Sequence, residues 1–116
     1  MQTAAQTVAT ALDAIRDKKG FNITILDLRH LPNMITDYLV ICSGTSDTQT
    51  GAIADSVEHQ LRLAGERPFR TEGKQRGEWI LLDYINVVVH IFLPRVRDYY
   101  SLEELWGDAP AQHYAE

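Results

Sequence analysis

Hydrophobic residues recur along the chain with two different periods, one typical of helices and one typical of strands. In residues 3–18, Val8, Leu12 and Ile15 fall on one side at helical spacing, which predicts an amphipathic helix that ends at Gly20. In residues 21–28 the pattern first alternates and then becomes continuously apolar, which predicts a strand. The chain therefore begins with a helix followed by a strand.

The stretch around which the chain is organised is residues 35–49. Its apolar run Tyr38-Leu39-Val40-Ile41-Cys42 has no polar face, so we expect a strand in the middle of a sheet that helices cover. Gly44 supplies the turn, and Ser46 and Gln49 have the spacing of a capping box. The helix that follows ends at Gly65. This strand and helix form half of a βαβ unit.

The second half predicts a short edge strand at residues 67–71, and a hairpin formed by residues 79–82 and 87–93. The turn between the hairpin strands is short, and its sequence, with Ile85 beside Asn86, matches no standard turn type. Pro94 ends the last strand, and two helical turns follow, the second opened by a capping box at Ser101. We expect one domain at residues 1–110 and a frayed tail at residues 111–116. The fold class is α/β: a single compact domain whose mixed sheet of about five strands carries packed helices.

The composition indicates the cellular compartment of the protein. One cysteine excludes an internal disulfide and fits a reducing compartment. No apolar run is long enough to span a membrane, and no basic start precedes an apolar segment as in a secretory signal. These features predict a cytoplasmic protein without a membrane partner.

The net charge of −5 is unevenly distributed. Residues 1–97 hold all eleven Lys and Arg and eleven of the sixteen acidic residues, so the later residues carry the whole imbalance. An acidic end beside a neutral body argues against non-specific nucleic-acid binding as the main activity, which requires a basic field. It suits either a basic protein partner or an ordinary solvated tail.

The sequence does not predict an active site. The turn before the central helix has Asp47 where a phosphate would lie, and no Lys follows it. Cys42 has no nearby cation to activate it and fits a core position, while the four histidines lack metal-site spacing. His90, in an apolar strand, fits an inter-strand histidine better than a ligand. We expect no catalytic residue, no cofactor and no metal.

Aromatic and acidic residues crowd into residues 79–106. The aromatic members are Trp79, Tyr84, Tyr99, Tyr100 and Trp106. A core of this size needs fewer of them, and exposed aromatic residues are favoured anchors at protein interfaces. Packing of the C-terminal turns onto the sheet is the other interpretation.

Four stretches carry a family resemblance: ITDYLVICSGTSDTQTGAIADSVE at residues 35–58, Glu72-Gly73, GEWILLDY with VVVHIF at residues 77–92, and RDYYSLEELWGDAP at residues 97–110. In order and spacing they resemble the ribosomal silencing factor family, also called the Iojap family, over residues 5–110. The chain departs from that family at two places. Ile85-Asn86 follows Tyr84 where Gly-Asp is usual, and Pro32-Asn33-Met34 precedes Ile35 where a small residue is usual.

The resemblance implies a shape similar to nucleotidyltransferases without their metal-binding carboxylates. It also implies binding to the universal large-subunit ribosomal protein number fourteen, which sterically prevents the subunits from joining and represses translation when nutrients are short. Ribosomal RNA would be a secondary contact. The partner-facing residues that it implies are Trp79, Leu81, Asp83, Tyr84, Tyr99, Tyr100, Ser101, Leu102 and Glu103.

Three alternatives stay open. A nucleotidyltransferase-like enzyme would need two or three carboxylates, from Asp27, Asp37 or Asp83, to meet within metal-bridging distance. An RNA-binding module would use the loop residues Arg67, Arg70, Lys74 and Arg76, although Glu66 and Glu72 weaken the field of that loop. A weak homodimer would form if an apolar strand of the hairpin were a sheet edge.

Overall fold

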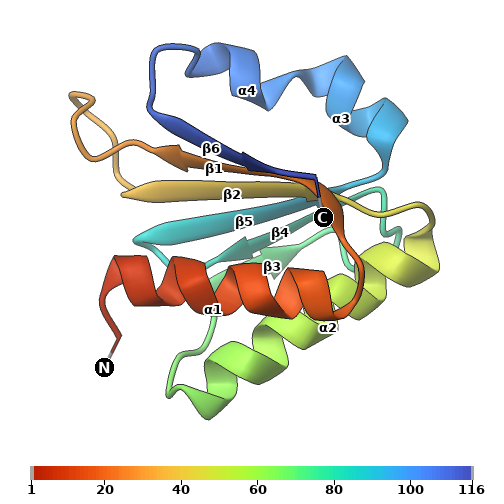
Figure 1. The fold of residues 1–116 in the computed structure, drawn as a ribbon. Helices are drawn as coiled ribbons and strands as arrows, with labels where there is room; N and C mark the ends of the chain where they lie inside the picture. Colours follow the sequence, from red (N-terminus) through yellow and green to blue (C-terminus); the bar gives the residue numbers. More distant parts are fainter. Residues whose placement is uncertain (1, 116) are drawn as a thin grey trace.

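The computed structural model describes residues 2–115 and contains one mixed sheet with helices on both faces (Figure 1). In chain order the elements are α1 (Ala4–Asp17), β1 (Phe21–Asp27), β2 (Tyr38–Ser43), α2 (Asp47–Leu63), β3 (Arg70–Glu72), β4 (Trp79–Asp83), β5 (Val87–Phe92), α3 (Pro94–Tyr100), α4 (Leu102–Leu105) and β6 (Ala111–Tyr114). The strand order is β3-β4-β5-β2-β1-β6. Only β2 and β5 are parallel among the described neighbours. The predicted α/β class is confirmed, with six strands in place of about five; the nucleotidyltransferase-like shape stays a prediction.

Strand β2 lies in the middle of the sheet, as its unbroken apolar run predicts. Val40 and Cys42 contribute to the larger core cluster beneath α1 and α2. Leu39 and Ile41 contribute to a second cluster on the other face. Because both faces of β2 are covered, neither needs polar side chains.

The start of α2 differs from the expected capping box. The Ser46 hydroxyl accepts the Gln49 backbone N–H at 3.1 Å, which forms one half of the box. The Gln49 side chain instead accepts the Thr45 N–H at 2.6 Å and donates to the carbonyls of Lys18 and Lys19 at 3.1 Å each. Gln49 therefore joins the end of α1 to the start of α2.

The expected frayed tail at residues 111–116 is wrong for Ala111–Tyr114, which form β6 and pair antiparallel with β1. The Arg16 guanidinium lies 4.6 Å from the centroid of the Tyr114 ring, across the sheet edge. Without β6, strand β1 would present an unpaired edge, which explains why the tail is ordered. Glu116 lies outside the described residues.

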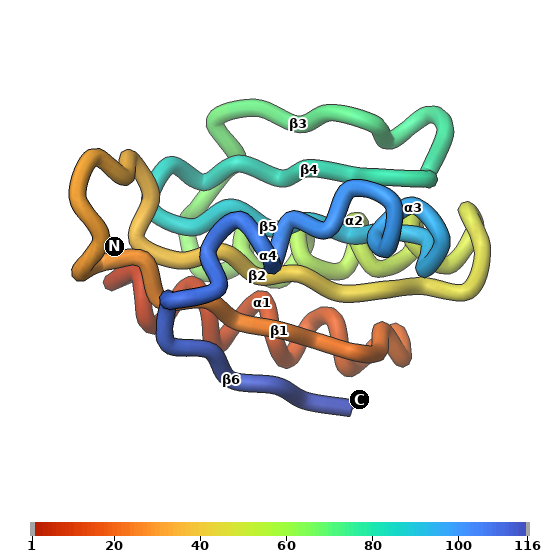
Figure 2. The backbone as a smooth tube through the Cα atoms, turned by 90° about the horizontal axis from the view of Figure 1, so that it is seen from above, coloured from red at the N-terminus to blue at the C-terminus, as the bar shows by residue number. Residues whose placement is uncertain are grey.

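The second face of the sheet carries α3 and α4, which we call the strap (residues 94–105). Val96 and Leu102 pack it onto the second core cluster. Seen from above, the strap lies over β5 and β2 and leaves β3 and β4 uncovered (Figure 2). The capping box expected at Ser101 is wrong: this residue has φ 47°, and its hydroxyl donates to the Asp98 carbonyl at 2.7 Å.

Arg97 fastens the strap to the sheet. Its side chain is 10% exposed and pairs with both oxygens of Glu103, at 2.9 and 3.1 Å. The remaining N–H groups donate to the Asn22 carbonyl at 2.5 Å, the Ser43 hydroxyl at 2.9 Å and the Thr24 hydroxyl at 3.2 Å. All five donors of the guanidinium are thus used. This pairing also holds the pKa of the Glu103 carboxyl below its ordinary value.

The β4–β5 turn places a β-branched residue in a left-handed conformation. Ile85 has φ 73°, and the Asn86 N–H donates to the Tyr84 carbonyl at 2.9 Å across it. The Asp83 carboxylate accepts the Ile85 N–H at 2.8 Å and steadies the turn. Both hairpin strands lie inside the sheet, so the free apolar edge expected for self-pairing is wrong: β3 and β6 are the edges.

Replacing Arg97 tests the strap. Arg97→Met should lower the free energy of unfolding by about 2–3 kcal/mol, because it leaves the Glu103 carboxylate and three further acceptors without their donor; water reaching Glu103 keeps the loss below that of a fully buried pair. Chemical denaturation measures it. Arg95→Met, a 74% exposed side chain on the same helix, is the control and should change stability by less than about 0.5 kcal/mol. Equal losses would contradict the fastening role.

Ile85→Gly should raise the free energy of unfolding by about 0.5–1 kcal/mol. Glycine relieves about 1–2 kcal/mol of left-handed strain, and its extra backbone entropy offsets about half of that gain. The side chain is 56% exposed, so little packing is lost. Ile85→Val keeps the β-branch and should bring no gain in thermal or chemical denaturation. A destabilised glycine variant would contradict the strain.

Candidate functional site

The uncovered part of the second face carries a cluster of large side chains that we call the aromatic face: Trp79, Leu81, His90, Tyr99 and Tyr100. Trp79 and Leu81 are two positions apart on β4 and therefore point to the same side of the sheet. His90 is the cross-strand partner of Leu81 on β5. The two tyrosines come from the end of α3. Residues of the β4–β5 hairpin and of the strap thus meet in the aromatic face.

Trp79 is held at the centre of the aromatic face. Its indole N–H donates to His90 Nδ1 at 3.0 Å. Its ring lies 4.9 Å from that of Phe92 and 4.7 Å from that of Tyr100, between ring centroids. Tilted rings at these separations attract one another beyond simple burial. The half-buried indole is therefore fixed before any partner arrives.

His90 is an inter-strand histidine, as we expected. Because an indole N–H only donates, the Nδ1 atom of His90 must accept, and the ring proton is on Nε2. The residue is 7% exposed, and burial lowers the pKa of His90 to about 4, although Asp83 favours the charged form. The imidazole is neutral at neutral pH and serves as an anchor for Trp79.

Tyr99 and Tyr100 project from the strap beside Trp79. They are 81% and 51% exposed, and their rings meet edge to face with centroids 5.0 Å apart. Large exposed aromatic side chains are frequent energetic anchors of protein interfaces. Two exposed tyrosines next to a fixed tryptophan give this surface the character of a docking site.

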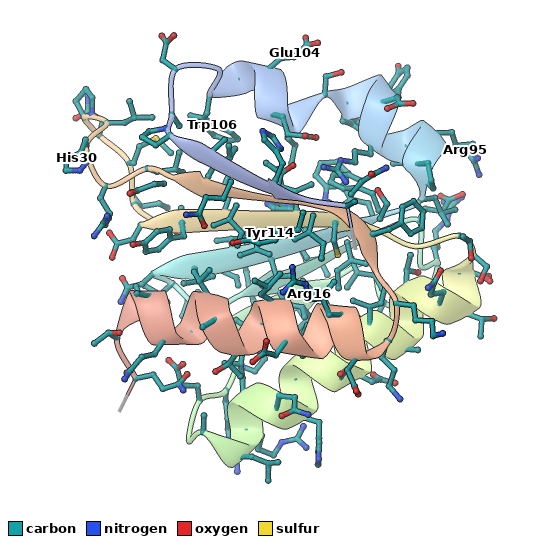
Figure 3. All side chains as sticks on the ribbon, in the orientation of Figure 1. Arg16, His30, Arg95, Glu104, Trp106 and Tyr114 are labelled. Atoms are coloured by element: carbon teal, nitrogen blue, oxygen red, sulfur yellow. The ribbon has the colours of Figure 1, made fainter. Side chains whose placement is uncertain are left out.

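A hollow of about 450 Å³ adjoins the aromatic face, between the β3–β4 turn and α3. Besides Trp79 and both tyrosines, its lining includes Gly73, Arg76, Glu78, Arg95 and Val96. Gly73 has φ 81°, and a Cβ there would lie 2.0 Å from the Trp79 carbonyl oxygen. Only glycine permits this close approach of the turn to Trp79. Arg95 lies at the far end of the strap from Glu104 (Figure 3).

The other residues implied by the resemblance have mainly structural contacts. Tyr84 is 8% exposed and lies in the core beneath the helices, where its hydroxyl has no partner among the described residues, so its expected place on the partner surface is wrong. Asp83 pairs with Arg70 and holds the hairpin turn. Leu102 packs under the strap. Ser101 and Glu103 serve the strap as described above.

Three polar residues lie beside the aromatic face: the sequence alone did not indicate Glu78 and Arg95, and it indicated Arg76 only as part of the RNA-binding loop of one alternative. Arg76 and Glu78 are two residues apart before β4, but Arg95 follows 17 residues after Glu78 at the start of α3, so no local period relates all three. The sequence predicts His90 in a strand but does not predict its contact with Trp79. The hairpin register, which pairs Trp79 with Phe92, is the signal that would have joined them.

Groups that a reaction could use are occupied elsewhere. Burial raises the pKa of the Cys42 thiol to about 12, which keeps it protonated. The Asp27 carboxylate is bound by Arg29 at 2.7 Å, and Asp83 by Arg70 at 3.2 Å. Within residues 2–115, no three His, Cys, Asp or Glu side chains gather as a metal site would require. None of the helices in the same range has the length and apolarity needed to cross a membrane.

His90 should make stability depend on pH. The pKa of His90 is about 4 in the folded chain and about 6.5 when unfolded, so between these two pH values mainly the unfolded state takes up the proton. The free energy of unfolding should therefore fall by about 2 kcal/mol between about pH 7 and pH 5, above the range where most carboxylates titrate.

Denaturation of His90→Gln at the two pH values measures this effect. Glutamine keeps an acceptor for the indole of Trp79 but does not titrate, so most of the fall should disappear. His59→Gln, an exposed histidine on α2, is the matched control and should retain it. An unchanged fall in the His90 variant would contradict the assignment.

Comparison with known proteins agrees with the resemblance. A family model described as "Ribosomal silencing factor during starvation" matches residues 1–116. Ribosomal silencing factor RsfS of Chromobacterium violaceum is 42% identical over 97 residues, 84% of this chain and 79% of that protein. The protein of the same name in Bacillus subtilis is 41% identical over 100 residues, 86% of this chain and 84% of that protein.

A solved structure gives the same answer for the fold. The crystal structure of a Chromobacterium violaceum protein matches with a TM-score of 0.87 at 39% identity, covering 91% of this chain and 88% of the other. Sequence and fold therefore agree over nearly the whole domain. The chain belongs to the ribosomal silencing factor family.

Proposed function

We propose that this chain represses translation by binding the large ribosomal subunit and keeping the small subunit away. Its protein partner would be the universal large-subunit ribosomal protein number fourteen, bound through the aromatic face. Nutrient shortage would be the condition under which it acts. Family membership supports the silencing role, and the partner follows from the resemblance described above.

The aromatic face is the observation that carries this proposal. It combines a fixed tryptophan with two exposed tyrosines, and such preformed anchors bind with little ordering cost. The outer side of the C-terminal region is acidic, with Asp98, Glu104 and Asp108 exposed. An acidic surface next to an aromatic anchor favours a basic ribosomal protein, which it would attract over a distance.

The proposed mechanism is steric. A bound domain whose extents are 36 × 33 × 24 Å would occupy the surface that the small subunit must reach. No bond is made or broken, which fits a site whose titratable groups serve hydrogen bonds and ion pairs. Repression would then depend on occupancy alone, and it would end when the factor dissociates.

Removing the two tyrosines tests the surface. Tyr99→Ala/Tyr100→Ala should weaken inhibition of subunit joining about thirtyfold, since loss of an interface anchor costs about 2 kcal/mol or more. Light scattering of mixed large and small subunits, followed over a range of factor concentrations, measures the effect. Both side chains lie largely outside the core, so the fold should persist.

Leu63→Ala is the matched control, because this exposed residue lies on α2, on the opposite face of the sheet (Figure 1). It should inhibit as well as the natural chain. If the tyrosine variant also inhibits fully, the aromatic face is not the contact. If the natural chain does not inhibit joining at concentrations well above those of the subunits, the steric mechanism is wrong.

A further inference from the structure

Two arginines converge on one carboxylate at the rim of the hollow. Arg76, in the β3–β4 turn, lies 3.3 Å from Glu78, and Arg95, in the first turn of α3, lies 3.4 Å from it. Their side chains are 82% and 74% exposed. Both guanidinium groups therefore reach into solvent next to the aromatic face.

Arg76 and Arg95 have more N–H donors than the Glu78 carboxylate can use. Each guanidinium carries five N–H donors, and the single Glu78 carboxylate leaves a net positive charge shared by the two. Other cations of the same region are better matched: Arg70 contacts Glu72 and Asp83, and Lys74 contacts Asp55 and Glu58. The rim of the hollow thus carries excess positive charge on a chain whose net charge is −5.

The chemistry of this rim favours a phosphate group. Guanidinium groups bind phosphate oxygens through paired N–H donors, and a phosphate can bridge two arginines without displacing the carboxylate between them. A surface of a ribosomal subunit offers such groups at every nucleotide of its RNA. The acidic surface of the C-terminal region, in contrast, would be repelled by RNA and suits a basic protein.

We propose that Arg76 and Arg95 bind backbone phosphates of ribosomal RNA beside the protein partner. The inference rests on the proposed function and assigns residues to a second contact on the same subunit. Contacts to phosphates carry no base sequence, but they fix orientation and register. The aromatic face then provides the protein contact, and the two arginines determine the orientation of the factor on the subunit.

The test compares two ligands for the natural chain and its variants: purified large ribosomal subunits and isolated ribosomal protein number fourteen. Arg76→Ala/Arg95→Ala should bind large subunits about tenfold more weakly at about 0.1 M salt, and the slope of log affinity against log salt should become shallower by about 1.5, for two lost phosphates. Its affinity for the isolated protein should not change.

Two further variants sharpen the comparison. Arg76→Lys/Arg95→Lys keeps both charges and should recover most of the salt dependence, with weaker binding because lysine lacks the planar fork. Arg62→Ala/Arg67→Ala removes two other exposed arginines and should leave both the affinity and the slope unchanged. Thermal denaturation of each variant confirms that the fold persists.

The outcomes separate this inference from the proposed function. An unchanged salt slope for the double alanine variant overturns the RNA contact. An equal loss of affinity for the isolated protein also overturns it and points to an acidic group on that protein. If the natural chain binds subunits with an arginine-dependent slope but does not bind the isolated protein, the RNA contact stands and the proposed protein partner is wrong. Binding to neither ligand overturns both.

Discussion

The second face of this domain depends on one buried guanidinium. Helices of seven and four residues are too short to be stable alone, so α3 and α4 keep their place only through tertiary contacts. Arg97 supplies the largest group of polar contacts among them, with Glu103 on the strap and with Asn22, Thr24 and Ser43 on the sheet. Tyr99 and Tyr100 end the same helix, so their position beside Trp79 depends on Arg97 together with the apolar contacts of Val96 and Leu102.

The strand residues of the aromatic face, Trp79 and His90, are positioned by contacts that do not involve Arg97. Gly73 lets the β3–β4 turn approach the Trp79 backbone, and the hairpin register places His90 where it accepts the indole N–H. The surface is thus assembled from two separately anchored parts that meet at the contact between Trp79 and Tyr100. A surface built in this way is rigid before binding, which limits the entropy lost when a partner docks.

Several side chains of reactive types serve structural roles in this domain. Cys42 fills the core, Asp83 steadies a turn and the buried His90 orients an indole. From sequence alone, the lack of metal-site spacing and the crowding of aromatic residues already favoured binding over catalysis. The residues of the site were harder to predict. Tyr99 and Tyr100 are exposed and Trp79 is half-buried against the second core cluster, and their contact with a partner stays a prediction. Tyr84 is buried on the other face because side chains alternate along the strand and its continuation.

The sequence by itself determined the central strand β2, the two long helices and the family, because these depend on local period and on motifs read along the chain. Tertiary structure decided the rest. Strand β6 pairs with β1, with His113 reaching Thr24 across 89 positions, and Arg97 reaches Asn22 across 75. Short polar segments of this kind have no hydrophobic period to show where they lie. Their places depend on unpaired backbone edges and buried charges, which exist only once the sheet has formed.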